Sequence, residues 1–151
     1  MKKVKLDYSE NAERIPGFLL WQVSKLWQRR LNTALEGLKL SSTQAIILGN
    51  IVRMTGQKKV VTQISLAEIT KVDPMTTSQA IRTLEKKKLI KRVVSKEDKR
   101  AFSIVPTRKG AQVTLKALQA FVAAHESFFK PVEKEIEEFG KSLHKLIKID
   151  T

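Results

Sequence analysis

Residues 62–105 constrain the fold more than any other part of the chain. They have the pattern of a short helix, a turn, a second helix and a two-stranded hairpin with a charged tip. Asp73 suits the N-cap of the second helix, because its carboxylate can accept hydrogen bonds from first-turn amides. Pro74 suits the first helical position. About four residues separate the two helices, which is the spacing of a helix-turn-helix.

The second helix has two chemically different faces. At about 100° per residue, Thr77, Ile81 and Leu84 fall on one apolar face. The opposite face carries a hydroxyl, an amide, two cations and a methionine, namely Ser78, Gln79, Arg82, Lys86 and Met75. The polar groups can hydrogen-bond to base edges and the cations can pair with phosphates, so this outer face suits contact with DNA.

The positive charge of the chain is concentrated in the same region. The 151 residues carry a net charge of +14. Residues 53–109 hold 15 Lys and Arg against 5 Asp and Glu, whereas residues 110–151 hold 6 of each sign. This distribution favours a polyanionic partner. The alternative is a charged surface that only keeps the protein in solution.

The hairpin is expected to consist of residues 89–94 and 101–105, which are both rich in β-branched side chains. Residues 60–61 are expected to form a minimal third strand. The connecting loop is almost wholly charged. After a basic recognition helix, such a hairpin is interpreted as a wing that approaches DNA.

The charged loop offers specific contacts with DNA. Arg100 is suited to a narrow minor groove, where the negative potential is enhanced. Asp98 lies two residues earlier and can hold the guanidinium of Arg100 by a charge-assisted hydrogen bond. Lys96 and Lys99 would then contact phosphates.

An unusually apolar helix is expected at residues 15–36. Its wide apolar band includes Phe18, Trp21 and Trp27, and Gly37 is expected to close the helix in a left-handed conformation. A band this wide needs more cover than a small domain provides. Burial against a partner subunit is the preferred interpretation, and burial within the chain is the alternative.

Three further helices are expected outside the helix-turn-helix. The first, at residues 38–54, begins with a capping box formed by Ser41 and Gln44. The other two are expected at residues 107–129 and 132–149, on either side of Pro131. Helices from both ends of two subunits are suited to one shared bundle.

Several classes of protein are excluded or disfavoured. The chain has no cysteine, which excludes disulfides, cysteine-based zinc sites and thiol chemistry and fits a cytoplasmic protein. No signal peptide and no membrane-spanning stretch is seen. His125 and His144 lack clustered ligands, so no metal or cofactor is expected. No constellation of catalytic residues is found, so an enzyme is not expected.

Three segments match a known family in order and spacing. They are LKLSSTQAIILGNI, TQISLAEITKVDPMTTSQAIRTLEKKKLIKR and SKEDKRAFSIVPTRKG. With them, nearly the whole chain resembles the MarR family of winged-helix transcriptional regulators. The D-x-R element of that family's wing appears as Asp98-Lys99-Arg100, and its L-T-x-x-G element appears at residues 106–110. Lys88 departs from the family, which usually has glycine there, and lysine tolerates left-handed geometry less well.

The resemblance implies a mainly α fold with a small β-wing. It implies a homodimer built by residues 1–37 and 107–151, and a DNA-binding winged helix-turn-helix at residues 38–106. The dimer would bind double-stranded DNA at a near-palindromic operator, usually as a repressor. The recognition-helix contacts carried over from the family pattern are Thr76, Ser78, Gln79, Arg82 and Thr83. The wing contacts carried over are Lys96, Lys99 and Arg100, with Asp98 in support.

Many members of this family release DNA when a small phenolic or anionic effector binds. Phe18, Trp21 and Trp27 are candidates for lining such a site, and ordinary core or interface aromatics are the alternative. A second functional class also stays open, namely a basic protein that binds RNA or DNA without sequence preference. RNA modules usually expose aromatic side chains for stacking, whereas the aromatics here fall in the apolar end helices.

Overall fold

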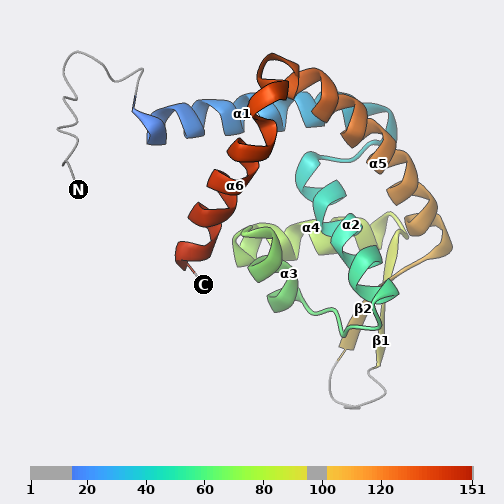
Figure 1. Ribbon diagram of the computed structural model, residues 1–151. Coiled ribbons are helices and arrows are strands. Elements are labelled where there is room, and N and C mark those ends of the chain that lie inside the picture. Colours follow the sequence, from blue (N-terminus) through green and yellow to red (C-terminus); the bar gives the residue numbers. More distant parts are fainter. Residues whose placement is uncertain (1–14, 95–101, 151) are drawn as a thin grey trace.

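The structure is a computed structural model that describes residues 15–94 and 102–150. Helices form most of the described chain, and two antiparallel strands form a small sheet (Figure 1). In chain order the elements are α1 (Pro16–Leu35), η2 (Glu36–Leu38), α2 (Ser42–Gly56), α3 (Gln63–Thr70), α4 (Pro74–Lys86), β1 (Ile90–Val94), β2 (Phe102–Pro106), α5 (Arg108–Phe129), η3 (Lys130–Glu135), α6 (Ile136–Ile147) and η4 (Lys148–Asp150). The expected class, mainly α with a small β-wing, is therefore confirmed.

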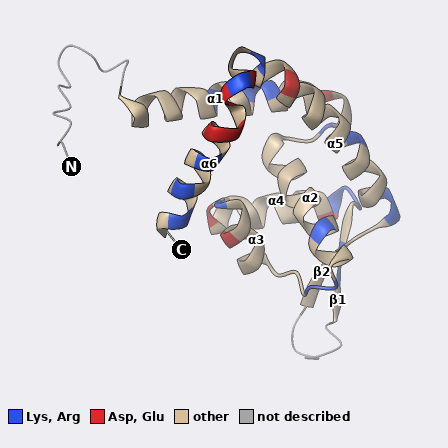
Figure 2. Cartoon of the chain, viewed as in Figure 1, with Lys and Arg blue, Asp and Glu red and all other residues tan. Residues whose placement is uncertain are grey.

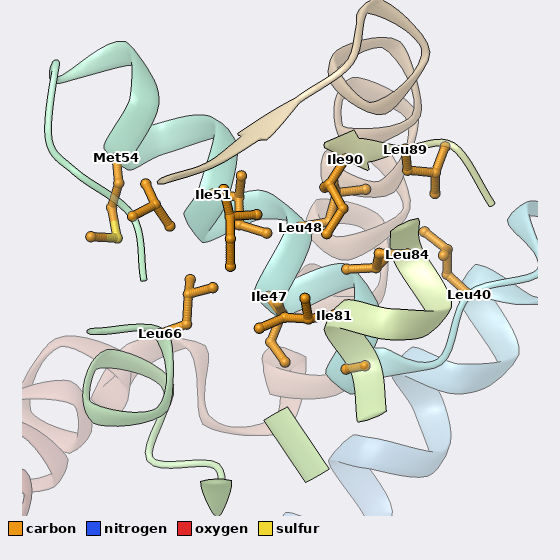
Figure 3. Close-up of a cluster of buried hydrophobic side chains, with 13 residues drawn as sticks. Leu40, Ile47, Leu48, Ile51, Met54, Leu66, Ile81, Leu84, Leu89 and Ile90 are labelled. Carbon is orange, nitrogen blue, oxygen red and sulfur yellow. The ribbon is translucent and has the colours of Figure 1, made fainter. Parts of the chain in front are cut away.

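The hydrophobic core lies beneath the helix-turn-helix. Side chains from α2, α3, α4 and both strands meet in one cluster (Figure 3). Ile47, Leu48 and Ile51 on α2 are fully buried at its centre. The cluster also takes in Leu40, Met54, Val61, Leu66, Ala80, Ile81, Leu84, Leu89, Ile90 and Ile104. This burial holds α4 so that its opposite face is turned to solvent.

Local capping chemistry fixes where the central helices begin. Ser41 accepts from the backbone N–H of Gln44 at 3.2 Å, and the Gln44 side chain accepts from the Ser41 N–H in return. Thr62 and Ser65 make the same reciprocal pair at the start of α3. Each pair satisfies N–H groups that a helix leaves free at its start. The capping box expected at Ser41 is confirmed.

A second layer of helices lies beside the helix-turn-helix lobe. α1 packs against α5, and the two lie together along one side of the molecule in Figure 1. Trp27 on α1 contacts the α5 rings of Phe121 at 5.5 Å and Phe128 at 5.2 Å between centroids. α6 makes its main contacts with the short helical segments η3 and η4 beside it. Within the described ranges, no helix combines the length and apolar character that crossing a membrane requires.

The end of α1 and the start of α6 differ from what the sequence predicts. α1 is followed by η2, and Lys39 rather than Gly37 adopts the left-handed conformation, with φ 55°. The expectation for Gly37 is wrong because Gly37 lies inside the 3-10 helix η2, and the left-handed residue follows that helix. At the other end, Val132 has a non-helical φ of −121°, and α6 begins only at Ile136. Pro131 perturbs a longer segment than expected.

The expected third strand is replaced by a single backbone hydrogen bond. The Ile104 N–H of β2 donates to the Val61 carbonyl at 2.9 Å. The Val61 N–H donates to the Ser103 hydroxyl at 3.2 Å instead of to a strand carbonyl. The sheet among the described residues therefore has the two strands β1 and β2. The Ser103 hydroxyl therefore accepts the hydrogen bond that a strand carbonyl would accept if the sheet continued to Val61.

The turn between α4 and β1 is left-handed at the residue where the family usually has glycine. Lys88 has φ 58°, and the Leu89 N–H donates to the Leu84 carbonyl at 3.0 Å. This is the Schellman arrangement, in which the left-handed residue just after a helix is usually glycine. Leu84 and Leu89 both lie in the core, which adds the apolar contact that accompanies the motif. The turn therefore keeps glycine geometry while carrying a lysine.

Lys88→Gly is expected to raise the free energy of unfolding by about 1 kcal/mol, because it removes the steric cost of a left-handed side-chain-bearing residue. Urea unfolding followed by circular dichroism measures this change. Lys116→Gly, in the exposed middle of α5, is the matched control and should lower stability by about 1 kcal/mol. Loss of stability in both variants would contradict the strain assigned to Lys88.

Candidate DNA-binding surface

The start of α4 is held by its own N-cap. The Asp73 carboxylate accepts from the Thr76 N–H at 2.8 Å, and Pro74 occupies the first turn. Hydrogen bonds from the Thr76 side chain and backbone lower the pKa of the Asp73 carboxyl from its ordinary value of 3.8. A lowered pKa in the folded state means that the ionised cap favours folding at neutral pH. That contribution is lost as the pH falls through the lowered pKa.

The inner face of α4 is fixed by packing and by one buried hydroxyl. Thr77 is fully buried, and its hydroxyl donates to the Val72 carbonyl at 3.3 Å. Ala80, Ile81 and Leu84 are buried with it. At the other end of the helix, the half-buried Lys87 donates to the Lys39 carbonyl and to the Gln44 side chain. Lys87 therefore joins α4 to the α1–α2 connection rather than facing solvent.

The outward face of α4 carries the predicted DNA-contacting residues. Thr76, Gln79, Arg82 and Lys86 are exposed there, whereas Ser78 and Thr83 are half-buried. Arg82 donates to the Ser78 hydroxyl at 3.0 Å, which holds the guanidinium along the helix. The Thr83 hydroxyl donates to the Gln79 carbonyl at 2.9 Å, so it is already satisfied within the helix. Gln79 and Arg82 therefore lie exposed along this face, where a ligand can reach them.

Helix α3 meets α4 at their N-terminal ends. The Gln63 amide donates to the Pro74 carbonyl at 3.4 Å, and Lys71 makes the left-handed turn between the helices with φ 55°. Sequence reasoning misses Gln63, because nothing local indicates a contact with a residue eleven positions later. This contact therefore brings the first turns of the two helices together.

The base of the wing is described, and its tip is not. β1 and β2 pair antiparallel from Ile90 opposite Pro106 to Val94 opposite Phe102. Arg92 on β1 lies 3.5 Å from the Glu85 carboxylate of α4. The four predicted wing contacts lie outside the described residues, namely Lys96, Asp98, Lys99 and Arg100.

Basic residues gather around the helix-turn-helix and the wing. In Figure 2, Lys and Arg mark the turn after α2, the segment around β1 and the start of α5. Residues 16–24, at the start of α1, carry no charged side chain. Lys and Arg also lie on α6, but residues 110–151 hold six basic and six acidic side chains, so the net positive charge is concentrated in the helix-turn-helix and wing. This distribution suits a polyanion on one side and an apolar contact on the other.

The three aromatic effector candidates do not share one cavity. Phe18 and Trp21 stack on each other at 6.1 Å on an exposed stretch of α1. Trp27 packs instead into the aromatic cluster of α5. A cavity of about 380 Å³ lies at the α5–η3–α6 corner and is lined by His125, Glu126, Phe129, Lys130, Glu133 and Ile136. None of the three candidates lines that cavity.

Comparison with known proteins identifies relatives that are helix-turn-helix transcriptional regulators. The sequence pattern of the MarR family matches residues 37–101. A Bacillus subtilis (strain 168) protein described as the uncharacterized HTH-type transcriptional regulator YdcH is 35% identical over 133 residues, covering 88% of this chain and 90% of that protein.

Two solved structures share the fold. An S. aureus MepR–DNA complex is 24% identical with a TM-score of 0.78, covering 92% of this chain and 99% of that one. CouR from Rhodococcus jostii RHA1, bound to p-coumaroyl-CoA, is 23% identical with a TM-score of 0.79, covering 92% and 96%. Together with the regulator from Bacillus subtilis and the family pattern, these similarities mean that the chain belongs to the MarR family of DNA-binding transcriptional regulators, which are not enzymes.

Proposed function

We propose that the protein binds double-stranded DNA at a near-palindromic operator as a homodimer, in the cytoplasm, and represses transcription there. The observation that carries this proposal is the outward face of α4. Capping and burial hold that helix at both ends, while Gln79, Arg82 and Lys86 stay exposed. An amide and a guanidinium on one helix face can read adenine and guanine edges in the major groove.

The proposed dimer interface is the apolar surface of α1, α5 and α6. Leu115, Leu118 and Val122 recur at helical spacing along α5 and are all exposed. On α1 the exposed apolar side chains are Phe18, Leu19, Leu20, Trp21, Val23 and Leu26. Soluble monomers rarely expose apolar patches this extensive.

Helix α6 adds a separate reason for a partner. It has only 12 residues and packs mainly on its own flanking turns, yet Phe139, Leu146 and Ile147 are exposed on it. An isolated helix of this length is marginally stable in water. A second copy would bury these faces. We therefore propose residues 1–37 and 107–151 as the dimerisation segments and residues 38–106 as the DNA-binding segment.

In the proposed complex, α4 enters the major groove and the wing approaches the adjacent minor groove. Gln79 and Arg82 are the proposed base contacts, and Thr76, Ser78 and Thr83 lie beside them. Lys96, Lys99 and Arg100 are the proposed wing contacts with Asp98 in support. A two-fold axis through the interface would place two copies of α4 about one DNA turn apart. A dimer on such an operator would block access to the promoter, so deleting its gene should raise transcription beside the operator.

Gln79→Ala and Lys86→Ala are expected to weaken DNA binding in different ways. Gln79→Ala should cost about 1–3 kcal/mol on the preferred duplex and relax the preference at one base pair per half-site. Lys86→Ala should weaken all duplexes alike and reduce the slope of log affinity against log salt by about one per subunit. Fluorescence anisotropy on matched duplexes measures both quantities. An unchanged base preference in Gln79→Ala would remove this residue from direct readout.

The alternative function is a basic protein that binds RNA or DNA without sequence preference. A competition experiment at moderate salt separates the two. A duplex with one inverted repeat, recovered from a pool of random sequences, should displace bound probe at concentrations at which RNA and random duplex do not. If RNA wins, or if all duplexes compete equally with only a steep salt dependence, the proposed function fails.

A small phenolic or anionic effector is the proposed signal that releases the operator. The support is the similar fold of CouR, whose structure holds p-coumaroyl-CoA. Phe18, Trp21 and Trp27 are the proposed lining residues, and the fluorescence of Trp21 and Trp27 should respond to a ligand bound beside them. Titrating p-coumaroyl-CoA into the protein–duplex complex tests this compound class. Unchanged fluorescence and unchanged duplex binding would count against it.

A further inference from the structure

The outward face of α4 contains one apolar side chain among its polar ones. Met75 is 82% exposed, more than any other large hydrophobic residue in the described part of the chain. It lies one helical turn before Gln79, which itself lies one turn before Arg82. A single exposed apolar side chain is ordinary on a protein surface, so the inference depends on where Met75 lies on α4 and not on its exposure alone.

The position of Met75 places it where base edges are met. It belongs to the first turn of α4, two residues after the Asp73 cap. Recognition helices contact base edges mainly through their N-terminal residues. In a polar groove, an apolar side chain gains free energy only by burial against another apolar group. The main apolar group that a base pair presents in the major groove is the 5-methyl group of thymine.

We infer that Met75 reads a thymine methyl group at one position in each half-site of the operator, an inference that rests on the proposed function. The thioether side chain is flexible and polarizable, so it can adjust to one methyl group without a fixed hydrogen-bond geometry. Gln79 and Arg82 would read neighbouring base pairs by hydrogen bonds. The same helix face would thus combine polar readout with one apolar contact.

Deoxyuridine substitution tests the inference, because uracil differs from thymine only by the missing methyl group. Duplexes recovered from a random pool would be remade with deoxyuridine in place of each thymine in turn. One position per half-site should weaken binding of the wild-type protein by about fourfold, the factor for burying one methyl group. Changing both half-sites together should weaken binding roughly 15-fold, because the two contacts are independent.

The variants then assign the effect to one side chain. Met75→Ala should bind the thymine duplex several-fold more weakly and should no longer distinguish thymine from uracil at that position. Met75→Leu should restore most of the discrimination. Ile64→Ala is the matched control, since it removes a similarly exposed apolar side chain from α3 and should leave the thymine-to-uracil ratio unchanged.

Two outcomes overturn the inference. The first is that no single deoxyuridine weakens wild-type binding. The second is that Met75→Ala keeps the wild-type thymine-to-uracil ratio, whether or not it weakens binding to both duplexes. In either case a preferred symmetric duplex has still been recovered, so the proposed function survives. If no preferred duplex is recovered at all, both the proposed function and this inference fail.

Discussion

Replacing Gly110 with alanine is expected to lower the free energy of unfolding by roughly 3 kcal/mol or more. A Cβ added at Gly110 would lie 1.9 Å from the backbone oxygen of Leu89 and 2.9 Å from its carbonyl carbon. Neither is a flexible side-chain end, so the start of α5 or the base of β1 would have to move. That loss is a large fraction of the roughly 5–15 kcal/mol that stabilises a typical domain.

The close approach of Gly110 to Leu89 is held by a set of hydrogen bonds around Thr107. The Thr107 N–H donates to the Leu89 carbonyl at 2.9 Å, and its hydroxyl donates to the Lys88 carbonyl at 2.8 Å. The same hydroxyl accepts from the Gly110 N–H at 3.0 Å and so caps α5. One threonine and one glycine thus fix the angle between the wing and the long helix. Widening this contact would also shift the wing.

Urea unfolding checks the Gly110 prediction, and a second glycine provides the control. Gly49 lies inside α2, and a Cβ added there would have nothing within 4 Å. Gly49→Ala is therefore expected to raise stability by about 0.5–1 kcal/mol, the helix preference of alanine over glycine. Equal effects of the two substitutions would mean that α5 and Leu89 do not approach each other as described.

Leu118→Glu is expected to convert the proposed dimer into a monomer and to weaken operator binding by about 10²–10⁴-fold. Leu118 is 56% exposed and lies between Leu115 and Val122 on the outer stripe of α5. A carboxylate there would have to be buried without a partner when two copies associate, which is strongly unfavourable. A monomer would then bind a single half-site and lose the gain from the linked second contact.

Light scattering gives the mass and fluorescence anisotropy gives the affinity of this variant. Lys116→Glu is the matched control, because it lies on the same helix, is exposed, and changes the net charge by more than Leu118→Glu does. At about 100° per residue it faces away from the apolar stripe, so the dimer should persist. A Leu118→Glu protein that stays dimeric would remove this part of α5 from the interface.

The central part of the fold follows from local chemistry that the sequence displays. Asp73 followed by Pro74 marks the start of α4. The apolar residues that recur at helical spacing after it predict which face of the helix is buried. Ser41 with Gln44 marks α2 in the same way. These signals are readable because each depends on residues within four positions of one another. The expected order of helix, turn, helix and hairpin is therefore confirmed, and the expected wing strands are correct to within one residue.

Features that depend on distant residues could not be predicted. Gly110 is required by the approach of Leu89, and Trp27 is half-buried because α5 brings aromatic rings to it. Neither partner is indicated by neighbouring sequence. Met75 illustrates a different limit, since periodicity predicts its outward direction. The predicted contacts do not include it, because they rest on hydrogen-bonding and charged side chains and on the family pattern.

Under the proposed function, the subunit's two parts serve different partners. The helix-turn-helix lobe has its own core, and that core holds α4 by three apolar side chains and a buried threonine. The helices at both ends keep exposed apolar faces that this core does not use. The spacing between two copies of α4 would therefore be set by the end helices. In the proposed mechanism, an effector that shifts those helices would change the spacing and release DNA.

The separation of half-sites in duplexes recovered from a random pool tests the central claim most directly. Two copies of α4 related by a two-fold axis predict an inverted repeat whose half-site centres lie about 10–10.5 base pairs apart, or a multiple of that distance. The mass of the complex should correspond to two chains per duplex. Recovered duplexes without an inverted repeat, or a complex with one chain per duplex, would contradict the claim that paired recognition helices read the operator.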